Sequence, residues 1–188
     1  MTDHLRARIL QAAYDCVARY GMAKTTMEDI ARQADLSRAT LYRAFPGGRD
    51  EVLDATVTWE VARFFRRVSD AIHPEELDAV AVLEQGLVAA RDSLEHHELL
   101  QRVLRDEADQ LLPSLATVMP LVRAALADWF RPWLERTRLR PGVDPAEAAD
   151  LVARMALSHL GSQGHWDLAD PAQVRDLVRG HLLAGILA

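Results

Sequence analysis

Apolar residues recur along the chain at spacings of three and four, which is the pattern of helices with one buried face. The first such stripe runs from Leu5 to Tyr20, and Gly21 follows where a helix would end on a left-handed residue. No stretch alternates between apolar and polar residues for long enough to predict a strand. The pattern therefore predicts an all-α protein.

A short second helix is predicted to begin at Thr25 or Thr26. Both Thr25-x-x-Glu28 and Thr26-x-x-Asp29 have the spacing of a capping box, in which a hydroxyl and a carboxylate satisfy the first backbone amides of a helix. Ile30, Ala31 and Ala34 supply its buried face. We expect this helix to be under three turns long.

A third helix follows almost at once. Ser37 is its N-cap candidate, and the helix runs from Arg38 to Phe45, where the sequence Pro46-Gly47-Gly48 ends it. Two short helices joined by about three residues form a helix-turn-helix. Residues 46 to 48 are the only plausible linker, so we expect a helix-turn-helix domain over residues 1–48 and a larger helical domain over residues 49–188.

The remaining helices are longer, and prolines mark most of their starts. We expect Pro120 and Pro132 to kink or interrupt the helix that contains them. The expected spans are Arg49 to Ile72, Pro74 to Leu94, Glu98 to Leu111, Pro113 to Arg136, Pro145 to Leu160 and Pro171 to Leu187.

Charge is unevenly distributed over a chain whose formal net charge is −6. Residues 1–50 hold 8 Lys and Arg against 6 Asp and Glu, whereas residues 51–188 hold 14 against 22. A basic N-terminal segment on an acidic body suggests a polyanionic partner for that segment alone.

The helix from Arg38 carries residues suited to reading DNA. In a helix-turn-helix the second helix enters the major groove, and its first turn does most of the base reading. Arg38 suits guanine, Ala39 a thymine methyl group, and Thr40 a base edge or a phosphate. Tyr42 and Arg43 point outward and suit phosphate oxygens.

Two further residues, Thr26 and Arg49, lie at the starts of neighbouring helices. They would flank the groove by contacting the DNA backbone. The full set of candidate DNA-binding residues is Thr26, Ser37, Arg38, Ala39, Thr40, Tyr42, Arg43 and Arg49. The alternative, a plain helical hairpin within a bundle, would not explain an exposed tyrosine and three arginines around one short helix.

The run ILQAAYDCVARYGMAKTTMEDIARQADLSRATLYRAFPGGRDEVL resembles the N-terminal domain of the tetracycline-repressor (TetR) family, above all in TTMEDIA and LSRATLYRAF. The resemblance implies a homodimeric, all-α transcriptional regulator, usually a repressor. It also implies a DNA-binding domain over residues 1–48 and a helical effector-binding and dimerisation domain over residues 49–188. A small molecule that enters the second domain would release the operator.

Three positions depart from the family pattern. Asp35 stands where the family usually has a turn glycine, a position that Asp tolerates better than most residues. Glu28 occupies a position that is often basic. The loop Pro46-Gly47-Gly48-Arg49 is one residue longer than usual, with Arg49 in the place of the customary phosphate-binding lysine.

The C-terminal half resembles many members of the family more loosely, in LLQRVLRDEADQLLPSL, AADLVARMALSHL and DPAQVRDLVRGHLLAGIL. In the family the last two helices usually form a four-helix dimer interface. One helix-turn-helix reads too few base pairs to be selective in a genome, which favours a dimer over packing within one subunit. The candidate interface residues are Leu151, Met155, His159, Leu177, His181 and Leu182.

Polar residues inside apolar stripes are candidates for an effector pocket, because a buried charge must be paired or face a wet cavity. The candidate lining residues are Trp59, Phe64, Glu84, Arg91, Glu107, Met119 and Trp129. The alternative is an ordinary interhelical ion pair, with Glu84 or Glu107 joined to Arg91 or Arg102.

Enzymatic and metal sites are not predicted, and no cofactor is expected. The sequence Asp106-Glu107-Ala108-Asp109 spells a helicase box, but Lys24 is the only lysine and lies in no phosphate-binding loop. His96-His97-Glu98 makes a poor chelate because adjacent helical residues point about 100° apart, so it is interpreted as a solvated helix start. Cys16 is the only cysteine, which excludes an intrachain disulfide.

A soluble, cytoplasmic protein without a membrane segment is expected. The start MTDHLRAR lacks the apolar core of a signal peptide, and the longest uncharged run, Gln110 to Val122, is too short to cross a membrane. Two functions remain: a ligand-responsive repressor bound as a homodimer to a near-palindromic operator, and a DNA-binding adaptor whose acidic body binds another protein.

Overall fold

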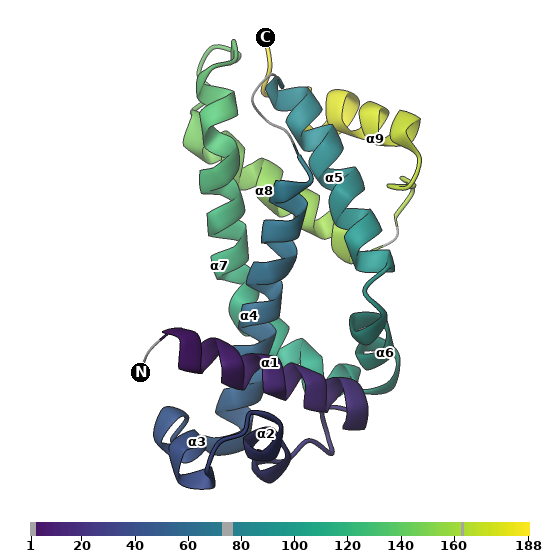
Figure 1. Cartoon of the computed structure of the whole chain (residues 1–188). Helices are drawn as coiled ribbons and strands as arrows, with labels where there is room; N and C mark the ends of the chain where they lie inside the picture. The colour runs from purple at the N-terminus through teal and green to yellow at the C-terminus, as the bar shows by residue number, and fades with distance from the viewer. Residues whose placement is uncertain (1–2, 73–76, 163) are drawn as a thin grey trace. The chain divides into compact units, whose positions relative to one another are not determined.

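The computed structural model describes residues 3–72, 77–162 and 164–188, and these form helices joined by short turns (Figure 1). The prediction of an all-α fold is confirmed. One isolated antiparallel bridge, between Leu139 and Leu187, is found in the described residues. The helices are α1 (Asp3–Tyr20), α2 (Met27–Gln33), α3 (Arg38–Ala44), α4 (Gly48–Asp70), α5 (Ala79–Glu95), α6 (Glu98–Asp106), α7 (Ala108–Glu135), α8 (Pro145–Gly161) and α9 (Pro171–Leu177), followed by a π-helical turn (Val178–Leu182).

Contacts divide the chain into two compact units. Unit 1 comprises Met1–Phe64 and His97–Val118, and unit 2 comprises Phe65–His96 and Met119–Ala188. The helices α4 and α7 each have residues in both units. The division into two functional domains after residue 48 stays a prediction. The predicted helix start at Pro74 lies outside the described residues.

Unit 1 has its main core where α1, α2 and α3 meet the first turns of α4 (Figure 1). Each helix turns its predicted apolar stripe inward, so that short helices with few internal hydrogen bonds are held by tertiary burial. The core residues are Ile9, Leu10, Ala12, Ala13, Cys16, Met27, Ile30, Ala31, Ala34, Leu41, Phe45 and Val52.

A second apolar cluster in unit 1 joins α1 and α4 to residues far along the chain. Val17 and Leu53 pack there with Val103 of α6 and Leu111 of α7, and Met22 from the α1–α2 turn completes the cluster. Residues 97–118 are therefore part of the same packed unit as the helix-turn-helix.

The break between α6 and α7 corrects the sequence prediction. The helix from Glu98 ends at Asp106, and a new helix begins at Ala108 and continues through Pro113. Val103 before the break and Leu111 after it pack in the same apolar cluster.

The helix α7 remains helical through Pro113, Pro120 and Pro132, so the predicted interruption is wrong. The alternative, a kink at Pro120 and Pro132, stays a prediction. By length and composition alone, α7 is long and apolar enough to cross a membrane. The search for uncharged runs in the sequence did not identify this helix. A core helix of a soluble protein passes the same test. The expectation of no membrane segment stays a prediction.

Unit 2 has its core between α5, α8, the last turns of α7 and the C-terminal helix. Small residues on α8 let the helices approach closely. The buried residues include Val82, Leu83, Leu87, Phe130, Leu134, Ala148, Ala149, Val152, Ala156, Val174, Leu177, Val178, Leu182 and Leu183.

The C-terminal helix differs from its predicted span. The α-helix ends at Leu177, and a π-helical turn follows to Leu182 in place of a helix reaching Leu187. The wider turn buries Leu182 and Leu183 together, although they are adjacent in sequence. The last residues then pair with residues 138–140 through backbone hydrogen bonds.

We expect Leu177→Ala to lower the free energy of unfolding by about 2–5 kcal/mol, because it removes a side chain with no exposed surface and leaves a cavity. Urea denaturation followed by circular dichroism measures this change. The matched control is Leu112→Ala at a leucine that is 54% exposed, where a change within about 0.5 kcal/mol is expected. Equal effects at both positions would contradict the placement of Leu177 in the core.

Candidate nucleic-acid interface

The helix α2 begins with a complete capping box. The Thr26 hydroxyl accepts a hydrogen bond from Asp29 N (3.2 Å), and the Asp29 carboxylate accepts one from Thr26 N (3.3 Å). Of the two predicted start sites, the one at Thr26 is thus confirmed. The hydrogen bond from the Thr26 hydroxyl is the main cause that lowers the pKa of Asp29. The carboxylate therefore stays ionised at more acidic pH than an ordinary aspartate.

The turn between α2 and α3 passes through Asp35, whose φ of 50° lies in the left-handed region. This confirms that Asp35 takes the place of the usual turn glycine. Ser37 then caps α3 by accepting a hydrogen bond from Thr40 N (3.1 Å). Leu41 and Phe45 are fully buried, which fixes the face that α3 turns outward.

Most candidate DNA-contact residues lie exposed on the outward side of this motif. Thr40 is half-buried, and its hydroxyl lies 2.9 Å from that of Ser37, so both hydroxyls already have a partner. The exposed candidates are Thr26, Ser37, Arg38, Ala39, Tyr42 and Arg43. Their contacts with DNA stay a prediction.

Arg38 lies beside an acidic residue of the preceding helix. Its guanidinium is 3.7 Å from the carboxylate of Glu28, and both side chains are largely exposed. Such a pair adds little stability, but it places a negative charge next to the arginine that is predicted to read bases. The sequence showed that Glu28 departs from the family pattern and gave no sign of this contact.

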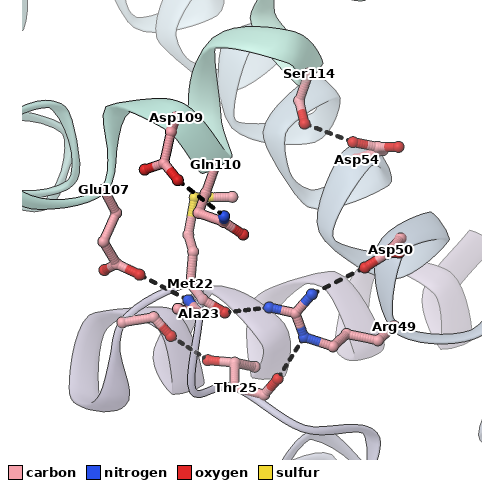
Figure 2. A network of polar contacts seen from close by, with 11 residues as sticks. Met22, Ala23, Thr25, Arg49, Asp50, Asp54, Glu107, Asp109, Gln110 and Ser114 are labelled. Atoms are coloured by element: carbon pink, nitrogen blue, oxygen red, sulfur yellow. Dashed lines mark hydrogen bonds and ion pairs between the residues drawn. The ribbon is translucent and has the colours of Figure 1, made fainter.

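Arg49 points into the protein and binds the turn between α1 and α2 (Figure 2). Its Nε donates to the carbonyl of Thr25 (2.9 Å) and its Nη2 to the carbonyl of Met22 (2.6 Å). Its Nη1 pairs with Asp50 at 2.8 Å. All three guanidinium nitrogens thus have acceptors within the chain, an arrangement that sequence reasoning missed when it predicted a phosphate contact.

The candidate pocket residues fall in both compact units. Trp59, Phe64 and Glu107 belong to unit 1, whereas the other four candidates, Glu84, Arg91, Met119 and Trp129, belong to unit 2. Glu107 accepts a hydrogen bond from Ala23 N (2.6 Å), so its carboxylate is engaged by the α1–α2 turn (Figure 2). Lining of a pocket by these residues stays a prediction.

The residues considered for interhelical ion pairs have other partners in the structure than the sequence analysis considered. Glu84 pairs with Arg179 at 3.3 Å, and Arg91 pairs with Glu95 at 2.5 Å along α5. Arg102 donates to the carbonyl of Val17 (2.9 Å). These partners are distant in sequence or lie on the same helix, and periodicity alone cannot choose between them.

Unit 2 contains a half-buried indole, that of Trp133, which sequence analysis did not single out. Among the residues that the structure describes, Trp133 Nε1 is buried and has no hydrogen-bond partner. Its ring lies 4.7 Å from that of Trp129, measured between ring centroids. A buried donor without an acceptor is unusual in a folded protein and is a candidate for a ligand contact.

The candidate dimer residues divide by burial. Leu151 is 48% exposed and His181 is exposed, while Met155 and His159 are half-buried. In contrast, the structure corrects the placement of Leu177 and Leu182. These two are 0% and 2% exposed within the single chain, so they have no surface left for a partner.

His97 is an N-cap rather than part of a solvated helix start. Its Nδ1 accepts a hydrogen bond from Leu100 N (3.2 Å), and its Nε2 lies 3.2 Å from Glu60 on α4. Because Nδ1 accepts, the neutral ring carries its proton on Nε2 and donates it to the carboxylate. Within residues 3–72, 77–162 and 164–188, no three His, Cys, Asp or Glu side chains are grouped to hold a metal ion.

Residues 9–56 match the family model of bacterial regulatory proteins of the tetR family. An uncharacterized HTH-type transcriptional regulator of Mycobacterium tuberculosis is 35% identical over 100 residues, which are 53% of this chain and 50% of that protein. The chain thus spans about half the length of the curated relatives it matches at this identity. An HTH-type transcriptional repressor of the same organism is 26% identical over 170 residues, covering 90% of this chain and 75% of the repressor.

Solved structures show the same fold. The structure of SmeT with triclosan is 25% identical and superposes with a TM-score of 0.59, covering 99% of this chain and 93% of SmeT. The similarity therefore extends past the helix-turn-helix into the C-terminal helices.

Proposed function

We propose that this chain, a member of the tetR family of bacterial regulatory proteins, is a DNA-binding transcriptional repressor. It binds a near-palindromic operator as a homodimer, and a small molecule releases it. The observation that carries the proposal is the outward face of α3, where Arg38, Tyr42 and Arg43 are exposed above the buried Leu41 and Phe45. A cytoplasmic location follows from this function.

Base reading is assigned to the first turn of α3. Arg38 can pair with guanine in the major groove, while Tyr42 and Arg43 contact phosphates. Thr26, at the start of α2, adds a further contact with the DNA backbone. The repressor named among the relatives supports negative regulation.

We propose that the dimer forms through exposed apolar residues of unit 2. Leu151 on α8 and Leu121 on α7 are 48% and 69% exposed. These two helices are joined by an ion pair between Arg123 and Asp150. A second copy packed on this face would remove both leucines from water.

We propose that the effector binds in unit 2 against Trp129 and Trp133. The two indoles give an apolar surface, and Trp133 Nε1 offers a buried donor without a partner among the described residues. The effector is thus mainly apolar and carries a hydrogen-bond acceptor. The triclosan complex of SmeT supports a small-molecule effector over a protein partner, which is the competing adaptor function.

The DNA-binding proposal is tested by selecting duplexes from a random pool with the full chain and by footprinting the product. We expect a preferred near-palindromic site, and we expect Arg38→Ala to reduce discrimination against a substituted guanine by about 1–3 kcal/mol. Arg105→Ala, at an exposed arginine of α6, is the control and should leave the preference intact. Failure to enrich any sequence would refute the proposal.

The dimer proposal predicts that Leu151→Glu gives a monomer, because it places an unpaired charge in an apolar interface. Light scattering at micromolar concentration measures the mass. Leu104→Glu, at an exposed leucine on α6, should remain dimeric. A dimeric Leu151→Glu variant would place the interface elsewhere.

The effector proposal predicts thermal-shift hits among phenols, alkyl alcohols and carboxylic acids. For such a hit we expect Trp133→Phe to weaken binding about tenfold, since it removes the donor and keeps an aromatic ring. Isothermal titration measures the affinity, and Trp166→Phe is the control. Equal affinities for Trp133→Phe and the unmodified chain would exclude the indole contact, and a screen without hits would favour the adaptor.

A further inference from the structure

The turn between α1 and α2 sets where the helix-turn-helix begins. It starts at Gly21, whose φ is +87°, and ends at Thr25, whose buried hydroxyl donates to the carbonyl of Gly21 (2.7 Å). Thr26, the N-cap of α2, is the next residue. Any displacement of this turn therefore moves the start of α2 directly.

Three charged side chains from other elements of unit 1 bind this turn and the end of α1. Arg49 of α4 donates to the carbonyls of Met22 and Thr25, and Arg102 of α6 donates to the carbonyl of Val17. Glu107, between α6 and α7, accepts from Ala23 N. We name Arg49, Arg102 and Glu107 the turn-binding cluster; Figure 2 shows two of its members, Arg49 and Glu107.

The charges in this cluster match the backbone groups that they bind. The carbonyls near the C-terminal end of α1 carry partial negative charge, which suits the two arginines. The Val17 carbonyl accepts from Arg102 in addition to its helical bond from Gly21 N (2.9 Å). The carboxylate of Glu107 meets an amide, and a hydrogen bond with one ionised partner is stronger than a neutral one. Glu107 also fills the space beside Gly21, where an added Cβ would lie 2.5 Å from Glu107 Oε1.

Resting on the proposed function, we propose that Arg49, Arg102 and Glu107 are positioning residues for operator binding. They touch no DNA, and they hold the α1–α2 turn so that α2 and α3 present their outward face in the orientation that fits the operator. This role differs from that of a phosphate clamp, because the guanidinium nitrogens of Arg49 are directed at carbonyls of the same chain.

The two roles predict opposite results for conservative variants. A phosphate clamp at position 49 tolerates Arg49→Lys, since lysine keeps the charge. A positioning role does not, because an ammonium cannot reproduce the two-carbonyl geometry of a guanidinium. For Glu107→Ala, loss of a negative charge alone would strengthen binding to every duplex, whereas loss of positioning weakens binding to the operator.

The test uses the full chain and two fluorescent duplexes, one selected from a random pool by the unmodified protein and one with its sequence shuffled. Anisotropy over a salt series gives affinity and salt slope for each. We expect Glu107→Ala and Arg49→Lys each to lose at least about tenfold in affinity for the selected duplex. Affinity for the shuffled duplex and the salt slope should not change, because no phosphate contact is removed.

Matched controls use exposed residues of α6. Glu98→Ala and Arg105→Lys make the same chemical changes without touching the turn, and they should bind both duplexes as the unmodified chain does. Glu107→Gln keeps an acceptor oxygen for Ala23 N, so it should retain most of the operator affinity. If Glu107→Ala fails to fold, Arg49→Lys and Glu107→Gln still separate the two roles.

A second readout needs no DNA. Hydrogen exchange of the Ala23 amide should accelerate in Glu107→Ala and stay unchanged in Glu98→Ala. Unchanged exchange, or a folded Glu107→Ala variant that binds the selected duplex normally, overturns the positioning role. An Arg49→Lys variant with normal affinity does the same for Arg49. An unmodified chain that prefers no duplex refutes the proposed function itself, a result distinct from these.

Discussion

The turn between α1 and α2 holds backbone groups outside any helix, and charged side chains from elsewhere in unit 1 bind them. Burying such groups without hydrogen-bond partners is costly. Here the partners are side chains from α4 and from the break before α7, and Arg102 of α6 adds a bond to the Val17 carbonyl in α1. The helix-turn-helix and the helix before it are therefore held by residues up to 85 positions away in sequence, in addition to their own core.

The chain breaks at Glu107, between α6 and α7. Val103 before the break and Leu111 after it pack in one apolar cluster. The Glu107 carboxylate at the break accepts a hydrogen bond from the α1–α2 turn. The small loss of helical hydrogen bonding is offset by apolar burial and by a charge-assisted bond.

Short-range chemistry made much of the structure predictable. The capping box at Thr26, the cap at Ser37 and the left-handed Asp35 each depend on residues within four positions, and each was found as expected. The inward face of α3 followed from the spacing of Leu41 and Phe45. These features suffice to place the outward face of α3.

Long-range contacts were not predictable in the same way. Periodicity identifies a buried face without saying what covers it, so Leu177 and Leu182 were assigned to a dimer although they lie in the core of the subunit. The partners of Arg49 and Glu107 are backbone atoms of a distant turn, for which a single sequence carries no signal. Proline was also overrated as a helix breaker in α7.

The carboxylate beside Arg38 bears on how such a protein finds its site on a chromosome. Positive charge on a DNA-binding surface strengthens binding that is independent of sequence. Glu28 offsets part of that charge, 3.7 Å from Arg38, while leaving the guanidinium exposed. If Arg38 reads guanine as proposed, the base competes for the arginine against a weak local partner. A larger share of the attraction to DNA would then depend on the bases that are read.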